Sequence, residues 1–163
     1  MRPRILMLIT LLIALGGVAF FFYERSRWAI STDGDLCYFS SAIGESGLAD
    51  VMSLKLSIMG TTASGELDSF PANKDPVKGT LLGTIRKDGV MRELDALYTY
   101  NAGGVPTIEE RIIRFDTLQA LIGVGEMVAG QDDVYVYKDK KTIQYNQMIP
   151  SVKCGAVQQT MFK

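Results

Sequence analysis

The chain has 163 residues, with 17 lysines and arginines against 18 aspartates and glutamates, so its formal net charge is −1. This length suits one globular domain with a substantial hydrophobic core and is too short for two. The chain contains no histidine and two cysteines. The lack of histidine excludes Ser-His-Asp, Cys-His and His-metal chemistry, and two thiols cannot build a four-thiolate zinc or iron–sulfur site. We therefore expect no metal and no cofactor.

An uncharged apolar run, Ile5–Tyr23, follows the N-terminus and has arginines on both sides. As a helix, its 19 residues at 1.5 Å each would span about 28 Å, close to the roughly 30 Å hydrocarbon core of a bilayer. A cleaved signal peptide is the alternative. Such peptides have shorter apolar cores, and the one fair small-x-small site, Gly17–Ala19, lies inside the run. The run therefore predicts a retained transmembrane anchor that contacts the lipid bilayer.

The anchor divides the chain into four parts. We expect a short cytoplasmic tail at residues 1–4, the anchor at 5–23, a juxtamembrane linker at 24–35 and one β domain at 36–163. Basic residues on the two sides of the anchor nearly balance, so charge alone does not set the orientation. The ordinary single-pass arrangement nevertheless places the larger C-terminal part in the periplasm or outside the cell.

The charge of that larger part bears on its partners. Without residues 1–27 the chain keeps 13 basic and 17 acidic side chains, a net charge of −4. Proteins bind nucleic acid largely by neutralising its phosphates with lysine and arginine. We therefore expect no nucleic-acid partner.

Both cysteines fall near the ends of the predicted domain, at Cys37 and Cys154. In an oxidising compartment this spacing favours one disulfide that ties the first strand to the last. Two separate buried thiols are the alternative. A bridge that closes a loop of more than 110 residues would stabilise the fold by about 4–5 kcal/mol on the chain-entropy model.

The first half of the domain has the pattern of strands joined by turns. From Val51 to Met59 apolar and polar residues alternate, which is typical of a half-buried strand. Asp88-Gly89 is a hairpin signal, and residues 40–50 and 71–76 have the composition of loops. The strands predicted here are Leu36–Phe39, Val51–Met59, Ala63–Leu67, Gly79–Arg86 and Val90–Tyr100.

The second half continues the pattern with two ambiguous segments. Ile108–Phe115 is predicted as a strand, although its charged start would also suit a helix. Leu118–Val128 could form a helix capped by Asp116, but its two glycines disfavour a helix, so we expect a strand with a glycine bend. The chain then closes with a strand at Val134–Tyr137 and a segment from Tyr145 to Cys154.

These segments predict a mainly β fold. Seven to nine short strands with turns every 8 to 12 residues, and no parallel crossover units, indicate a single antiparallel barrel or sandwich. The predicted architecture is therefore one such domain preceded by one N-terminal transmembrane helix.

Glu126 is the one acidic residue that the sequence singles out. Its neighbours Val124, Met127 and Val128 would allow a partly buried carboxylate with a raised pKa. The alternative is a solvent-facing glutamate or one paired with Arg111 or Arg114. Adjacent acids such as Glu109-Glu110 point to opposite faces of a strand, so they do not form a carboxylate pair for catalysis by themselves.

The chain resembles a group of small uncharacterised bacterial envelope proteins. An apolar N-terminal anchor, a cysteine near the domain start, Gly125–Met127, the segment Val134–Lys140 and a final cysteine carry this resemblance. It implies an anchored compact β domain. It implies no activity, so no functional residue is transferred from the group.

Together these observations predict a non-enzymatic binding or envelope-associated module. A small barrel can hold an apolar ligand, and an envelope protein is the other expected partner. One alternative is an auxiliary subunit whose anchor helix packs against a larger membrane protein through the small residues 14–19. Another is an enzyme that uses carboxylates or a Ser-Lys dyad.

Overall fold

The computed structural model describes residues 34–43 and 49–155. Within these ranges it contains ten strands and two short 3-10 helices. The strands are β1 (Gly34–Ile43), β2 (Ala49–Met59), β3 (Thr62–Phe70), β4 (Val77–Asp88), β5 (Met91–Ala102), β6 (Val105–Phe115), β7 (Gln119–Val124), β8 (Met127–Ala129), β9 (Val134–Tyr137) and β10 (Gln144–Val152). The 3-10 helices are η1 (Gln131–Asp133) and η2 (Lys140–Thr142).

In the part of the chain that the structure describes, no helix is long and apolar enough to cross a membrane. The predicted cytoplasmic tail at residues 1–4 and the anchor at 5–23 lie outside the described residues. Almost all of the predicted linker at 24–35 does so too. The anchor and the orientation of the domain therefore stay predictions.

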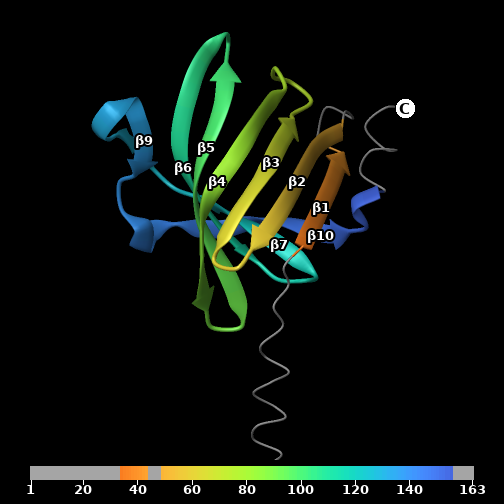
Figure 1. Cartoon of the computed structure of the whole chain (residues 1–163). Coiled ribbons are helices and arrows are strands. Elements are labelled where there is room, and N and C mark those ends of the chain that lie inside the picture. The colour runs from red at the N-terminus through yellow and green to blue at the C-terminus, as the bar shows by residue number, and fades with distance from the viewer. Residues whose placement is uncertain (1–33, 44–48, 156–163) are drawn as a thin grey trace, which may run out of the picture. The chain divides into compact units, whose positions relative to one another are not determined.

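The strands close into a barrel (Figure 1). β1 to β6 follow one another as antiparallel neighbours, so they form a meander of five hairpins. β6 then pairs with β7, β7 with β10, and β10 with β1. This circular order defines an eight-stranded antiparallel barrel, and β9 and β8 extend the sheet outward from β6.

This architecture confirms the mainly β prediction and selects the barrel over the sandwich. The number of strands exceeds the predicted seven to nine, because Leu118–Val128 forms two strands, β7 and β8, instead of one bent strand. The break falls at Gly125, where an added Cβ would lie 3.0 Å from the ring of Tyr137. Ile108–Phe115 is part of β6 and does not adopt the alternative helix.

The prediction of a loop over residues 40–50 is wrong for the residues at both of its ends. β1 continues through Ile43, β2 begins at Ala49, and these two residues pair with each other. Small and polar residues such as Ser40 and Ser41 suggest a loop in isolation. Pairing with β2 satisfies their backbone groups, so the tertiary ladder overrides the local preference.

The hairpin turns follow from their glycines. Gly103 and Gly104 join β5 to β6 with φ angles of +57° and +87°. Two successive residues at positive φ are what a type I′ turn requires, and its twist matches that of the flanking strands. The turn sets the register in which Ala102 opposes Val105 and, further along, Tyr98 opposes Glu109.

The hydrophobic core fills one end of the barrel. Alternate residues of each strand point inward, so β2 buries Leu54, Leu56 and Ile58 while the residues between them face outward. At this end Phe115 is fully buried, and the guanidinium of Arg92 lies 4.6 Å from the centre of its ring. Packed apolar side chains therefore close this end of the barrel.

The outer edge of β6 is shared between two strands. β7 pairs with Ile113–Phe115, whereas β9 runs parallel to Ile108 and Glu109. In the described part of the chain, residues 110–112 of β6 have no paired strand on this side. We call this gap between β7 and β9 the seam, and the Tyr137 side chain fills it. Its hydroxyl donates to the Gly123 carbonyl at 2.8 Å.

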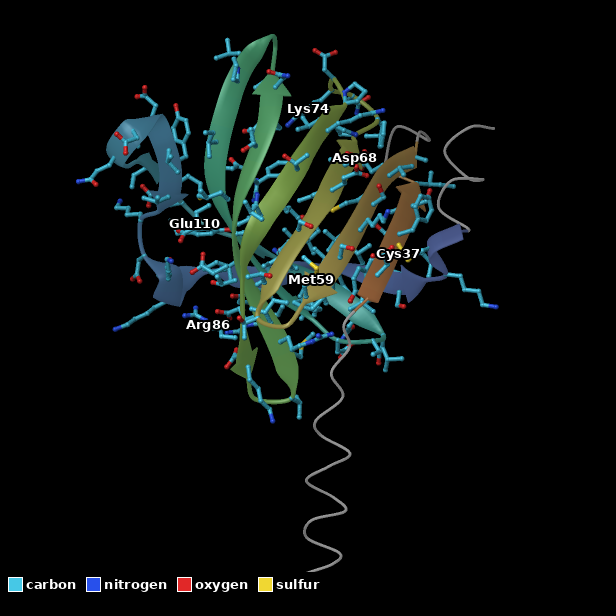
Figure 2. The ribbon with its side chains drawn as sticks, viewed as in Figure 1. Cys37, Met59, Asp68, Lys74, Arg86 and Glu110 are labelled. Carbon is cyan, nitrogen blue, oxygen red and sulfur yellow. A yellow bond between two sulfur atoms is a disulfide. The ribbon has the colours of Figure 1, made fainter. Side chains whose placement is uncertain are left out.

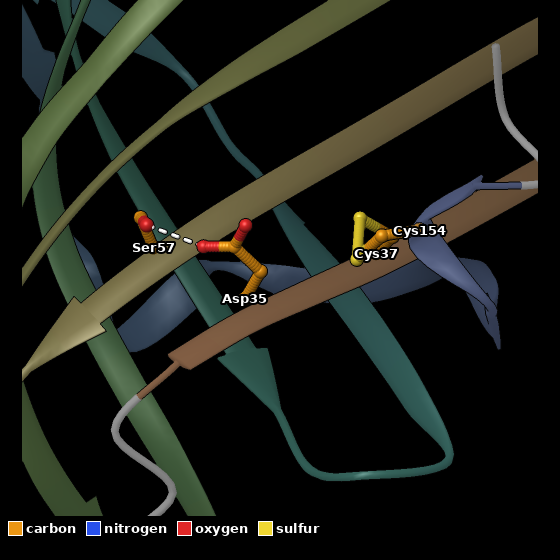
Figure 3. Close-up of a disulfide and its surroundings, with 4 residues drawn as sticks. All are labelled: Asp35, Cys37, Ser57 and Cys154. Atoms are coloured by element: carbon orange, nitrogen blue, oxygen red, sulfur yellow. Dashed lines mark hydrogen bonds between the residues drawn. A yellow bond between two sulfur atoms is a disulfide. The ribbon is translucent and has the colours of Figure 1, made fainter.

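The predicted disulfide is present. Cys37 of β1 is bonded to Cys154, directly after β10, with a Cα–Cα distance of 5.0 Å (Figure 3). Next to it on the same face of β1, Asp35 accepts a hydrogen bond from Ser57 of β2 (Figure 3). The bridge therefore ties together two strands, β1 and β10, that pair through two residue pairs only.

Candidate functional site

A cavity of about 300 Å³ occupies the end of the barrel opposite Phe115, and it is partly open to solvent. Seven strands contribute to its wall, from β2 through β7 and β10. The lining residues are Met52, Leu67, Ser69, Val77, Tyr98, Tyr100, Glu109, Arg111, Ile122 and Gln147. Most of this surface is apolar or aromatic, and a few polar groups converge on it, which is the usual composition of a small-molecule site.

The inner faces of β4 and β5 create part of this space. Gly79 lies on the inner face of β4, where an added Cβ would come within 2.4 Å of the Tyr98 ring. The glycine therefore lets the tyrosine ring lie flat against the β4 backbone. Any larger residue there would push the ring from its present position.

Tyr98 and Tyr100 form the aromatic wall of the cavity. Their ring centres are 4.9 Å apart and the rings are stacked. The Tyr98 hydroxyl donates to the Leu67 carbonyl at 2.8 Å. Burial raises the pKa of both phenols, and the nearby carboxylate of Glu109 adds to the rise at Tyr100. Both tyrosines are therefore neutral at physiological pH.

The polar groups of the cavity come from neighbouring inward positions of β6. Glu109 forms an ion pair with Arg111 and also accepts a hydrogen bond from the Tyr100 hydroxyl at 3.3 Å. The glutamate side chain is 10% exposed and the arginine side chain 25% exposed. The buried Nε of Arg111 has no hydrogen-bond acceptor among the described residues. Both side chains line the cavity, so the pair presents N–H donors and carboxylate acceptors to it.

Glu126 does not belong to this cavity. Its side chain is 67% exposed and accepts two hydrogen bonds from Lys138 at 2.9 and 3.1 Å. The possibility of a partly buried acid is therefore wrong. Glu126 lies between the end of β7 and the start of β8, and its apolar sequence neighbours leave it exposed there. Glu126 is instead the solvent-facing glutamate of the alternative. Its ion-pair partner is Lys138, not Arg111 or Arg114.

The adjacent acids of β6 separate as their spacing predicts. Glu109 points into the barrel, whereas Glu110 lies on the outer side (Figure 2). There Glu110 forms an ion pair with Lys140 of η2 and accepts a hydrogen bond from the Tyr137 amide. The two carboxylates thus face different environments and do not share a cleft.

A third buried acid, besides Glu109 and Glu110, lies on the outer face of the meander. Glu93 accepts hydrogen bonds from Arg86 and Arg114, which neighbour it on β4 and β6. Burial raises the pKa of its carboxyl, but the hydrogen bonds and charges of the two arginines outweigh burial and hold the pKa below its usual value. Both carboxylate oxygens of Glu93 are thus hydrogen-bonded, so we assign the cluster of Glu93, Arg86 and Arg114 a structural role and call it the brace.

The outer wall also carries a shallow hollow over β2, β3 and β4. Lys55, Glu66 and several small residues line it, including Ser64 and Gly65. Its volume is also about 300 Å³, but it is more open to solvent than the interior cavity, and no buried polar pair is among its described lining residues. The interior cavity is therefore the stronger candidate for a binding site.

Sequence reasoning missed the residues that build this site. Tyr98, Tyr100, Glu109 and Arg111 are two pairs with a spacing of two, on strands joined by the Gly-Gly turn. Such spacing places each pair on one face of its strand, and the hairpin register would have set the pairs side by side. The spacing of these residues in the sequence could therefore have indicated a polar group inside the barrel.

Comparisons with protein-family models, with curated proteins and with solved structures find no match to the chain. The resemblance to small envelope proteins therefore stays a prediction. The case for a function depends on the geometry of the cavity.

Proposed function

We propose that the chain is a non-enzymatic binding module, tethered to a membrane with its barrel outside the cytoplasm, and that the barrel holds a small, mainly apolar ligand. The observation that carries this proposal is the cavity itself. Inward side chains fill the Phe115 end of the barrel and leave about 300 Å³ beside Tyr98 and Arg111. A barrel that served only as a rigid partner surface would have no need for this space.

The composition of the wall supports a ligand with an apolar body. Met52, Leu67, Val77 and Ile122 contribute aliphatic or thioether surface. The stacked tyrosines add aromatic surface that favours contact with a planar or extended molecule. Methionine adapts its shape to different ligands because its side chain has several rotatable bonds.

The size of the cavity limits the ligand. Ligand pockets range from about 300 to 1,000 Å³, so this one lies at the lower end. It suits one or two aromatic rings or a short alkyl chain. A whole phospholipid would not fit.

Binding of a neutral fluorescent probe tests the proposal. The full chain, reconstituted in phosphatidylcholine nanodiscs, is titrated with the neutral two-ring fluorophore 6-propionyl-2-dimethylaminonaphthalene, and empty nanodiscs supply the background. We expect a saturable increase in fluorescence above this background.

Two matched tryptophan variants on β3 localise the binding. Ser69 lines the cavity, whereas Ser64 lies on the outer face of the same strand and lines the shallow hollow. Ser69→Trp should abolish saturable binding, because the new ring fills the cavity, and Ser64→Trp should preserve it. Absence of saturable binding, or loss of binding in Ser64→Trp alone, would contradict the proposal.

A further inference from the structure

We infer that the cavity selects a ligand with a neutral polar head, one that both donates and accepts a hydrogen bond, such as an alcohol or a primary amide. This inference rests on the proposed function and specifies its ligand class. The juxtaposition behind it is the ion pair of Glu109 and Arg111 in the wall of an otherwise apolar cavity. Three properties of this pair lead to the conclusion.

The first property is charge balance. Glu109 and Arg111 carry opposite charges, and no other residue in the described lining is charged at neutral pH. Tyr98 and Tyr100 stay protonated, as described above. The wall therefore has no net charge to compensate an ionic ligand.

The second property is the closeness of the two charges. The Arg111 guanidinium already contacts the Glu109 carboxylate. A ligand carboxylate that approached the arginine would stand next to a like charge, and a ligand ammonium at the glutamate would meet the arginine. Like charges within a few ångströms repel strongly where burial limits screening. Either ionic head would have to break the existing pair.

The third property is the unused hydrogen-bonding capacity. An ionised carboxylate has about four lone-pair sites, and Glu109 accepts from Tyr100 and Arg111. The Arg111 guanidinium has five N–H donors, of which the hydrogen bond to Glu109 uses one, and its side chain is 25% exposed in the cavity lining. A hydroxyl or primary amide supplies an acceptor to the arginine and a donor to the glutamate, without breaking the pair.

Competition with the fluorescent probe tests this selectivity. Hexan-1-ol, hexanoate and hexylamine share one chain length and differ in the charge of the head at pH 7.4. Each is titrated against the probe bound to the full chain in phosphatidylcholine nanodiscs, and inhibition constants refer to the free aqueous concentration. We expect hexan-1-ol to bind at least tenfold more tightly than either ion.

A merely apolar pocket would also prefer the alcohol, because ions lose more hydration on burial. The variant Glu109→Gln separates the two explanations. It leaves Arg111 without its counter-charge while nearly preserving the side-chain shape. We expect the hexanol-to-hexanoate ratio to fall at least tenfold or to invert in this variant. The control Glu126→Gln, at an exposed ion pair outside the cavity, should leave the ratio unchanged.

The outcomes separate this inference from the proposed function. Failure of the probe to bind the wild-type chain would contradict the function itself. If the probe binds, three results would overturn the inference alone: hexanoate or hexylamine binding as tightly as hexan-1-ol, no displacement by hexan-1-ol, or an unchanged ratio in Glu109→Gln.

Discussion

The two parts of the barrel wall are built in different ways. In the meander, β1 to β6, neighbouring strands share long registers, with eleven residue pairs between β5 and β6 and ten between β4 and β5. In the closing segment, β7 to β10, the registers are short, with three pairs between β6 and β7 and two between β10 and β1. Backbone ladders thus dominate the first part, and the second needs other connections.

Side chains supply these connections. The Tyr38 hydroxyl of β1 donates to the Asp116 carbonyl just after β6 at 2.6 Å, and Tyr137 fills the seam beside β6. The disulfide of Cys37 and Cys154 completes the junction between β1 and β10. A barrel can therefore close with few backbone ladder pairs where a disulfide and side-chain hydrogen bonds join the strands instead.

Removal of the disulfide should have the largest effect. The double variant Cys37→Ala, Cys154→Ala frees a loop with a sequence separation of 117, so we expect the free energy of unfolding to fall by about 2–5 kcal/mol. Chemical denaturation measures this loss. Amide exchange should locate it mainly in β10 and β7, and equal loss of protection in β4 and β5 would argue against the contrast between the two parts.

The seam tyrosine should come next. Tyr137→Phe leaves the buried carbonyl of Gly123 without its donor, so we expect a loss of about 1–2 kcal/mol in the free energy of unfolding. Tyr135→Phe is the matched control, because Tyr135 is 46% exposed on the same strand. That control should stay within about 0.5 kcal/mol of the wild type. Equal losses in the two variants would show that the hydrogen bond from Tyr137 to Gly123 adds nothing to the free energy of unfolding.

Acid should weaken the brace on the meander. The folded-state pKa of Glu93 lies below its ordinary value because two arginines outweigh the cost of burial. The stabilisation is therefore present above the ordinary glutamate pKa of about 4.3 and is lost as the pH falls through the lower folded value. We expect Glu93→Gln to cost about 1–2 kcal/mol at pH 7. The difference from wild type should shrink towards zero in denaturation curves at pH 2, and a constant difference would contradict this pKa assignment.

The smallest effect should come from the exposed pair of Glu126 and Lys138. Both side chains are more than half exposed, and surface ion pairs contribute about 0–1 kcal/mol. Lys138→Gln should therefore change the free energy of unfolding by less than about 0.5 kcal/mol and lose even this in high salt. A larger loss would mean that the closing segment depends on its surface charges.

Sequence reasoning was most successful in the meander and least successful at the junctions. Alternation from Val51 to Met59 and the turn glycines specify strands and hairpins locally. Glycine also signalled the interruption at Gly125, although it separates two strands and does not bend one. The disulfide of Cys37 and Cys154 is the exception among the junctions, because its two residues were evident in the sequence. These features depend on neighbouring residues or on simple chemistry, which a sequence displays directly.

Features that depend on distant strands could not be predicted. Barrel and sandwich share the same alternation, and only the pairing of β10 with β1 and β7 distinguishes them. The cavity depends on which inward residues meet across the barrel, including Gly79 beneath Tyr98. Glu126 was a candidate because of its apolar neighbours, yet it lies in the break between β7 and β8 and is exposed. The polar pair inside the barrel was not predicted, because from the sequence we considered Glu109 only together with Glu110 and Arg111 only as a possible partner of Glu126.

The central claim is that the barrel interior binds a small ligand with a neutral head. Methyl NMR of the full chain in nanodiscs tests it most directly, with hexan-1-ol as the titrant. We predict saturable shifts at the cavity methyls of Met52, Leu67 and Ile122, and none at the exposed Leu82 and Leu97 on the outer wall. Shifts confined to the outer leucines, or no saturable shift at the cavity methyls, would contradict the account.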